Sequence, residues 1–459
     1  MNSYTASVSR RKAPVGTSKN HRNRAVPTGV GPRTALVVAG TTFISISRLH
    51  QEVAILATLR VTLLLTALSV VLLMSQSARW KPKQLSRHWL FRSIAIITLV
   101  AIVGVPFGIY PGQSFRFLRD NFLRTLLEGA IVLAVARSPG GLRLMTQTVA
   151  GAGLTACALA LRAGRLDSDG RLSGATMYDA NDLALVANVT LPLLLWWYAD
   201  KANRGGRVAL ALIPIPLWVL LQTGSRGGFL GLAATAIGFI IVGFSHARPR
   251  LRRITIAVAA VGMLSLPLVP SDYVGRMGTI FNLQEDYNVT SRTGRIAVWK
   301  RGIGYGLSRP VFGVGIDNFN TAEGRLSDVA QNLRAGEGFK WSTAHNSFVQ
   351  LWAELGPAAA LLFAWAVARL TWSLLTWRSG GRAPPPPKRS DELDMSYLAP
   401  LLGVSLVGLV VSAIFLSFAY YPLTYMMLGL AGGALIQTSS ETDQRVRRSS
   451  RTARRTRPA

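Results

Sequence analysis

Apolar runs of about 17–25 residues recur along this sequence, and each is long enough to cross the ~30 Å hydrocarbon core of a bilayer. A soluble protein of this length would instead show amphipathic stripes and alternating strands. Only 16% of the 459 residues are charged, whereas soluble domains carry about 25%. The sequence therefore predicts an all-α polytopic membrane protein.

About twelve transmembrane helices are predicted from these runs. The first is the weakest, because it is short and rich in Thr and Ser. The predicted spans are 34–48, 53–74, 92–110, 121–137, 142–161, 182–200, 207–223, 226–244, 254–270, 345–375, 397–417 and 420–437.

The basic residues of the short loops predict the orientation of these spans. Cytoplasmic loops carry an excess of Lys and Arg compared with loops on the outer side. Only short loops are compared, because long loops cross the membrane largely regardless of their charge. If the N-terminus is cytoplasmic, the inner loops are richer in basic residues than the short outer loops. These inner loops are 75–91, 137–143, 200–207, 245–253 and 376–396. We therefore expect a multi-pass protein of the cytoplasmic (inner) membrane with both termini cytoplasmic.

The net charge of +30 raises the question of nucleic-acid binding. Much of this charge lies in the two ends of the chain and in short loops between apolar runs. That distribution is typical of positive-inside topology and of attraction to anionic membrane lipids, so no nucleic-acid partner is predicted. Residues 1–33 are interpreted as a disordered basic cytoplasmic tail, and 438–459 as a second basic cytoplasmic tail.

One long polar segment interrupts the apolar runs. Nine spans are predicted over 34–270 and three over 345–437, and residues 271–344 lie between them as a large extracytoplasmic loop. The loop is rich in Gly, Asn, Asp and Arg, and it is too long to serve as a simple connector. We therefore expect it to carry the chemistry of the protein.

His345 is the only histidine placed where this loop re-enters the membrane. Histidine is suited to proton abstraction at ambient pH because its ordinary pKa lies near neutrality. A single histidine at the start of an apolar helix can equally be an interfacial or structural residue. Its position alone leaves both interpretations open.

Two arginine-containing segments are expected on the same side as His345. Arg226 lies in a tight turn between two spans, and flanking glycines allow a ligand or helix to approach closely. In the loop, Arg292, Arg295 and Trp299 fall at helical spacing, roughly on one face. Arginine binds phosphate oxygens bidentately, so convergent arginines suit a pyrophosphate. The alternative is that they are surface or headgroup-contacting arginines.

Two ionisable residues are predicted inside a span, toward its outer half. Arg124 and Glu128 are four residues apart. Intramembrane ionisable residues are candidates for function, but an ion pair that only holds helices together explains them equally well. The sequence contains no Cys/His cluster, no HExxH and no GxxxxGK[ST]. No metal, cofactor or ATPase site is therefore predicted.

Several of these motifs, in this order, resemble the O-antigen ligase/O-antigen polymerase family. They are Asp179-Ala-Asn181-Asp-Leu-Ala, Ser225-Arg226-Gly-Gly, Arg295-Ile-Ala-Val-Trp299, Pro310-Val-Phe-Gly-Val-Gly-Ile-Asp-Asn-Phe319, and His345-Asn346-Ser with Gly356. The resemblance is specific over about residues 180–360 and covers the rest of the chain only as topology.

The resemblance implies a GT-C-like fold that uses polyprenyl-pyrophosphate-linked glycan donors on the outer membrane face. It implies that His345 is the general base on an acceptor hydroxyl. It also implies that Arg226 and Arg295 hold the pyrophosphate, with Arg292 as the competing assignment. Ser225, Asn181 and Asn346 take supporting positions. The acceptor is a glycan, a lipid or a protein, and the mechanism requires no metal because arginines neutralise the leaving group.

Two other functions remain open from the sequence. A protein O-oligosaccharyltransferase would share this chemistry and differ in its acceptor. A transporter of lipid-linked oligosaccharides would show repeated halves and polar residues near the membrane midplane, and neither feature is evident. The sequence therefore favours a polysaccharide polymerase or ligase.

Overall fold

The structure is a computed structural model that describes residues 29–77, 88–167, 170–174, 178–245, 249–264, 271–278, 290–332, 341–377 and 393–455, with side chains as far as Ser439. In these residues the chain is almost entirely α-helical. A single short antiparallel ribbon pairs β1 (Arg165–Leu166) with β2 (Leu172–Ser173). The predicted N-terminal tail up to residue 28 and most of the proline-rich inner loop, 378–392, lie outside the described residues.

The helices follow the order of the predicted spans. The first half contains α1 (Pro32–Ser47), α2 (Leu49–Glu52), α3 (Ala54–Thr58), α4 (Val61–Met74), α7 (Trp89–Gly104), η1 (Val105–Phe107), α8 (Pro111–Phe117), η2 (Leu118–Phe122), α9 (Leu123–Ala136), α10 (Pro139–Ala163) and α11 (Ala180–Ala199). Next come α12 (Gly206–Ala211), α13 (Pro214–Gln222), α14 (Arg226–Ser245) and α15 (Pro249–Leu264). Residues 271–344 contain α16 (Ser271–Gly278), α18 (Arg295–Ser308), α19 (Phe319–Leu326) and α20 (Asp328–Gln331). The chain continues with α21 (Ser347–Leu355), α22 (Pro357–Leu375), α23 (Met395–Ala413) and α24 (Pro422–Arg455).

The helix lengths confirm the multi-pass, all-α membrane class. Six helices in the described part of the chain are long and apolar enough to cross a bilayer: Trp89–Phe107, Pro139–Ala163, Ala180–Ala199, Arg226–Ser245, Pro357–Leu375 and Met395–Ala413. Other predicted spans coincide with shorter or broken helices. For example, span 53–74 is divided into α3 and α4, and span 207–223 into α12 and α13. The number of twelve spans and the GT-C-like fold stay predictions.

The predicted span 345–375 is also wrong as a single helix. The run 345–375 forms α21 and α22, which are separated at Gly356. Gly356 has φ +82°, and a Cβ there would lie 2.7 Å from the Pro310 carbonyl oxygen. Pro357 then begins α22. A residue with a side chain would be strained in this conformation, so the Gly-Pro pair breaks the run although its hydropathy is continuous.

α21 is attached to the large loop by backbone hydrogen bonds. The Val314 N–H donates to the Ala353 carbonyl over 2.8 Å, and the Gly315 N–H donates to the Glu354 carbonyl over 3.0 Å. The Trp352 indole N–H donates to the carbonyl of Ile303 over 3.1 Å. The motif Pro310–Phe319 is therefore a segment of the large loop that is hydrogen-bonded to α21, the helix that follows His345.

The centre of the bundle is formed by α11 and α23, whose apolar windows are 89% and 78% buried. Both helices pack against α14. The Asn188 side chain donates to the Gly228 carbonyl over 2.9 Å and to the Ser412 hydroxyl over 3.1 Å. Small residues allow membrane helices to approach closely and let polar side chains bond across the interface. This packing fixes the position of the first turn of α14.

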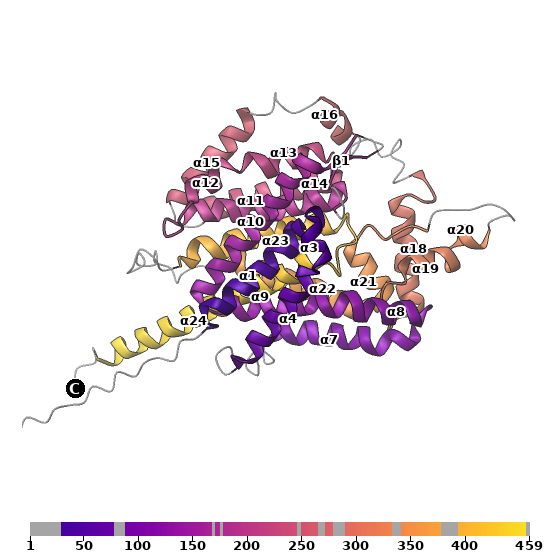
Figure 1. Ribbon diagram of the computed structural model, residues 1–459, viewed down its shortest axis with the longest axis horizontal. Coiled ribbons are helices and arrows are strands. Elements are labelled where there is room, and N and C mark those ends of the chain that lie inside the picture. The colour runs from indigo at the N-terminus through magenta and orange to yellow at the C-terminus, as the bar shows by residue number, and fades with distance from the viewer. Residues whose placement is uncertain are drawn as a thin grey trace, which may run out of the picture.

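Loops predicted on the same side of the membrane lie together. At one end, Arg143 is 3.9 Å from Asp200, and Arg250 donates to the Tyr198 carbonyl. At the other end, the Tyr178 hydroxyl donates to the Ile46 carbonyl over 2.8 Å. Figure 1 shows α18, α19 and α20 at one end of the molecule and α24 projecting from the opposite end. α24 continues as one helix through most of the predicted C-terminal tail. Which end faces the cytoplasm stays a prediction.

Candidate active site

His345 lies in a tight turn just before α21, half-buried and with a left-handed backbone conformation, φ +45°. Non-glycine residues rarely adopt this conformation, although Asn, Asp and His do so more often than most. Two hydrogen bonds hold the turn from opposite sides. The His345 N–H donates to the Ser417 hydroxyl over 3.0 Å, and the Trp299 indole N–H donates to the Ala344 carbonyl over 2.8 Å.

The next two residues complete the turn. The Asn346 side chain accepts the backbone N–H groups of Phe348 and Val349 and caps α21. The Ser347 hydroxyl donates to the Leu416 carbonyl over 2.7 Å and accepts the Phe418 N–H over 2.8 Å. Backbone strain persists where the surroundings over-determine it, and it concentrates at functional sites. The His345 turn has this character.

The two candidate loop arginines differ in their positions. Arg295 is the first residue of α18 and is half-buried, whereas Arg292 precedes the helix in the turn 291–294 and its side chain is exposed. Placing Arg292 on the same helical face as Trp299 was therefore wrong. Gly294 is extended at the N-cap, so the helix cannot run back to Arg292. The geometry favours Arg295 over Arg292 as the arginine that accompanies Trp299.

Arg226 is the first residue of α14, and polar contacts hold the turn before it. The Ser225 hydroxyl accepts the Gly228 N–H over 3.0 Å and donates to the Asn181 side chain over 2.9 Å. Ser225 thereby acts as a helix cap, which satisfies an otherwise free backbone donor. Ser225 and Asn181 are therefore in direct contact at the N-terminus of this helix, and their supporting role in a site stays a prediction.

The three segments singled out in the sequence meet at Phe415, in the connection between α23 and α24. A Cβ on Gly227 would lie 2.6 Å from the Cβ of Phe415, so α14 touches this side chain. The centre of the Phe415 ring lies 6.3 Å from the centre of the Trp299 ring. The Trp299 indole N–H donates to the carbonyl of Ala344, the residue before His345. The beginnings of α14 and α18 and the His345 turn are therefore gathered around one aromatic side chain.

Arg171, in the loop that carries β2, was not among the predicted site residues. It donates to the Asn181 side chain over 2.8 Å and to the Thr223 carbonyl over 3.0 Å. It ties this loop to the start of α11 and to the turn before α14. The sequence around Arg171 has no clear periodicity, so Arg171 contributes to the prediction only as one of the charged residues of the loops.

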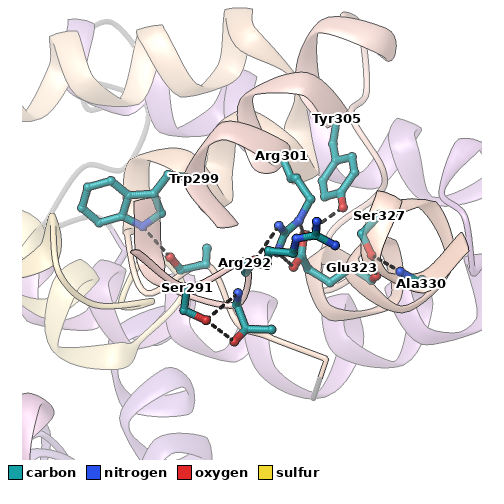
Figure 2. A network of polar contacts seen from close by, with 10 residues as sticks. Ser291, Arg292, Trp299, Arg301, Tyr305, Glu323, Ser327 and Ala330 are labelled. Atoms are coloured by element: carbon teal, nitrogen blue, oxygen red, sulfur yellow. Dashed lines mark hydrogen bonds and ion pairs between the residues drawn. The ribbon is translucent and has the colours of Figure 1, made fainter. Parts of the chain in front are cut away.

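A buried ion pair organises the loop helices (Figure 2). Arg301 in α18 forms two hydrogen bonds to Glu323 in α19, at 2.9 and 2.5 Å, and the Tyr305 hydroxyl donates to Glu323 over 2.8 Å. Arg301 also donates to the Arg292 carbonyl over 2.9 Å. Hydrogen bonding to Glu323 raises the pKa of Arg301, and burial raises the pKa of Tyr305. The network fixes the start of α18, where Arg295 lies.

Replacing Glu323 by alanine is expected to destabilise this part of the loop by about 3–5 kcal/mol, because Arg301 would remain buried without its counter-charge. Arg325→Ala, which removes an exposed charge from the same helix as Glu323, should cost no more than about 0.5 kcal/mol. Hydrogen exchange of the α18 and α19 amides in purified protein would measure both effects. Equal protection in Glu323→Ala and wild type would contradict the stabilising role of the pair.

Arg124 and Glu128 lie in α9. The Arg124 guanidinium is 3.2 Å from the fully buried Glu128 carboxylate, which also accepts the Ser45 hydroxyl of α1 over 2.9 Å. Their visible contacts are those of an ion pair that ties α9 to the end of α1. Across the described residues, no group of three or more His, Cys, Asp or Glu side chains is placed to hold a metal ion.

Comparison with known proteins matches residues 208–364 to the model of a family described as O-Antigen ligase. The match extends from α12 into α22 and includes Arg226, Arg295 and His345. It does not include Asn181 or the α23–α24 connection that contacts the site. No curated protein matches the chain.

Proposed function

We propose that this membrane protein, whose residues 208–364 match the O-antigen ligase family, is a glycosyltransferase of surface polysaccharide synthesis. It transfers or polymerises glycan units from a polyprenyl-pyrophosphate donor to an acceptor hydroxyl. The reaction takes place on the outer face of the cytoplasmic membrane, and both termini are cytoplasmic. Anionic lipids surround its basic inner loops.

The convergence around Phe415 carries this proposal. Two arginine-bearing helix starts and a histidine turn, distant in the sequence, meet at one end of an apolar bundle. Arginine forks suit phosphate oxygens, and a neutral imidazole suits a hydroxyl proton. A donor with a lipid tail in the bilayer and a pyrophosphate at its surface would present these groups to such a site.

In the proposed mechanism, the His345 imidazole accepts the proton of the acceptor hydroxyl as its oxygen attacks the anomeric carbon of the donor sugar. The bond between that carbon and the pyrophosphate oxygen breaks, and its electron pair leaves with the polyprenyl pyrophosphate. Arg226 and Arg295 neutralise the charge that develops on this leaving group. The proton on His345 is then released to solvent. Electrostatic stabilisation by arginines fills the role that a metal ion has in other enzymes.

Profiles of surface polysaccharide in a deletion strain, complemented with variants at matched protein levels, would test the function. We expect Arg295→Ala to abolish the mature product and Arg292→Ala to preserve it, since only Arg295 lies on the helix that contacts the His345 turn. Short lipid-linked units that accumulate would identify a polymerase. Long unattached lipid-linked polymer would identify a ligase.

Other outcomes would overturn the proposal. Loss of glycan from proteins alone would indicate a protein O-oligosaccharyltransferase with the same donor chemistry. Loss of surface polysaccharide with donor trapped on the cytoplasmic side of the membrane in the deletion strain would indicate a lipid-linked oligosaccharide transporter. A wild-type profile from Arg295→Ala together with loss from Arg292→Ala would reverse the assignment of the two arginines.

A further inference from the structure

Arg48 is a second residue with a left-handed backbone near the candidate site. It ends α1 with φ +58°, and its guanidinium lies 5.5 Å from the centre of the Tyr178 ring. The Tyr178 hydroxyl donates to the Ile46 carbonyl, and this hydrogen bond holds the Tyr178 ring against the end of α1. An arginine has no intrinsic preference for this conformation, which makes its presence here informative.

One N–H donor of the Arg48 side chain has no hydrogen-bond partner among the described residues. This donor is the Nε–H, which is buried. Buried polar groups are almost always hydrogen-bonded, and an exception calls for an explanation such as an absent ligand. The Nε–H and a neighbouring Nη–H of arginine form the fork that fits two oxygens of a phosphate.

Arg48 lies near the same helix end as the site described above. α11 begins at Ala180, where Asn181 bonds to Ser225 beside Arg226. The charge of Arg48 interacts with Asp182 of this first turn and with Tyr421. The Tyr421 ring stacks on Phe418 at 4.2 Å, and the Phe418 N–H bonds to Ser347 in the His345 turn.

Charged groups of both signs lie near the end of α1. Arg124 is paired with the buried Glu128, and Asp179 and Asp182 are acidic groups at the start of α11. Burial and, to a smaller extent, the charges of Arg48 and Arg124 lower the pKa of His50, which lies two residues after Arg48. An anion would therefore be held here by the Arg48 donor itself and not by an excess of positive charge.

We propose that Arg48 is a further donor-binding residue, which holds a phosphate of the lipid-linked substrate near the start of α11. The inference rests on the proposed function. The donor phosphates then lie between arginines on α1 and α14, with the start of α11 beneath them. A bilayer phospholipid headgroup offers the same chemistry, and the test must separate the two sources.

Binding of undecaprenyl pyrophosphate to the full chain in phosphatidylcholine nanodiscs would test the assignment. Arg48→Gly relieves the backbone conformation while removing the side chain, so it is expected to fold at least as well as wild type. Its affinity should fall by about tenfold or more, the loss expected for one charge-assisted contact. Arg60→Gly is the matched control, because Arg60 is also left-handed (φ +47°) but exposed at the start of α4. It should bind as wild type does.

The outcomes separate this inference from the proposed function. Wild-type affinity in Arg48→Gly, with binding weakened in Arg226→Ala, would overturn the role of Arg48 and leave the glycosyltransferase proposal standing. Absence of binding and turnover in the wild-type protein would count against the function itself. If phosphatidylglycerol nanodiscs abolish the difference between Arg48→Gly and wild type, Arg48 binds a lipid headgroup and the donor assignment is wrong.

Discussion

A His345→Asn variant is expected to fold normally and to lose glycan transfer by about 10²–10⁴-fold in turnover, the usual contribution of a general base. Asparagine tolerates the left-handed backbone of His345 and keeps a polar side chain, but it cannot accept the hydroxyl proton. Turnover with lipid-linked donor in purified, reconstituted protein would measure the effect. Donor affinity should change little, because the imidazole acts on the acceptor.

The control for this variant lies in the same turn. Asn346→Asp retains an oxygen that can accept the two N–H groups at the start of α21, so it should keep most of the turnover. Turnover in His345→Asn within a factor of about three of wild type, far below the effect of a general base, would exclude His345 as the base. The arginines alone would then have to account for catalysis.

Arg226→Ala is expected to lower kcat by about 10²–10³-fold, the cost of removing one preorganised group that stabilises charge in the transition state. Arg226→Lys should recover only part of this loss, because an ammonium cannot form the bidentate fork. Steady-state kinetics with varied donor would separate the effects on kcat and on KM. A change in KM alone would mean that Arg226 binds donor and transition state equally.

Arg165→Ala provides the comparison. Arg165 is an exposed arginine of β1 in the loop that also carries Arg171, so it shares the expected side of the membrane and the general charge. Its replacement should leave kcat within a factor of about two, because exposed charges are strongly screened by salt. Equal losses in Arg165→Ala and Arg226→Ala would indicate a general electrostatic effect on donor recruitment instead of a specific contact.

The membrane class and the order of helices could be predicted from the sequence, because bilayer thickness sets the length of an apolar run. The breaks in those runs were harder to predict. Gly356 lies within a continuous apolar stretch, and the strain that selects glycine there comes from the Pro310 carbonyl, which is distant in sequence. A hydropathy profile averages over many residues, so it does not reveal a helix break at a single glycine.

The site was predicted in part for a related reason. His345, Arg226 and Arg295 carry chemical signals in their side chains and their motifs. Ser417 and Leu416 hold the His345 turn through one hydroxyl and one backbone carbonyl, in a segment that otherwise reads as apolar. Glu323 looks like a solvated loop acid, and only the fold brings Arg301 against it. In the sequence, Arg48 resembles any other basic loop residue, and only the structure shows its left-handed backbone.

The separation of α21 from α22 at Gly356 has a mechanical consequence. α21 bonds to the loop through Val314, Gly315 and Ile303, so the helix that follows the His345 turn belongs to the loop as much as to the membrane bundle. A rotation at Gly356 that also broke the bonds of the turn to Ser417, Leu416 and Phe418 would move His345, Trp299 and Arg295 together. The spacing between the proposed base and the loop arginine would be preserved, while their distance from Arg226 on α14 would change. In the proposed function, such a division would let one part hold the lipid phosphate while another adjusts to acceptors of different size.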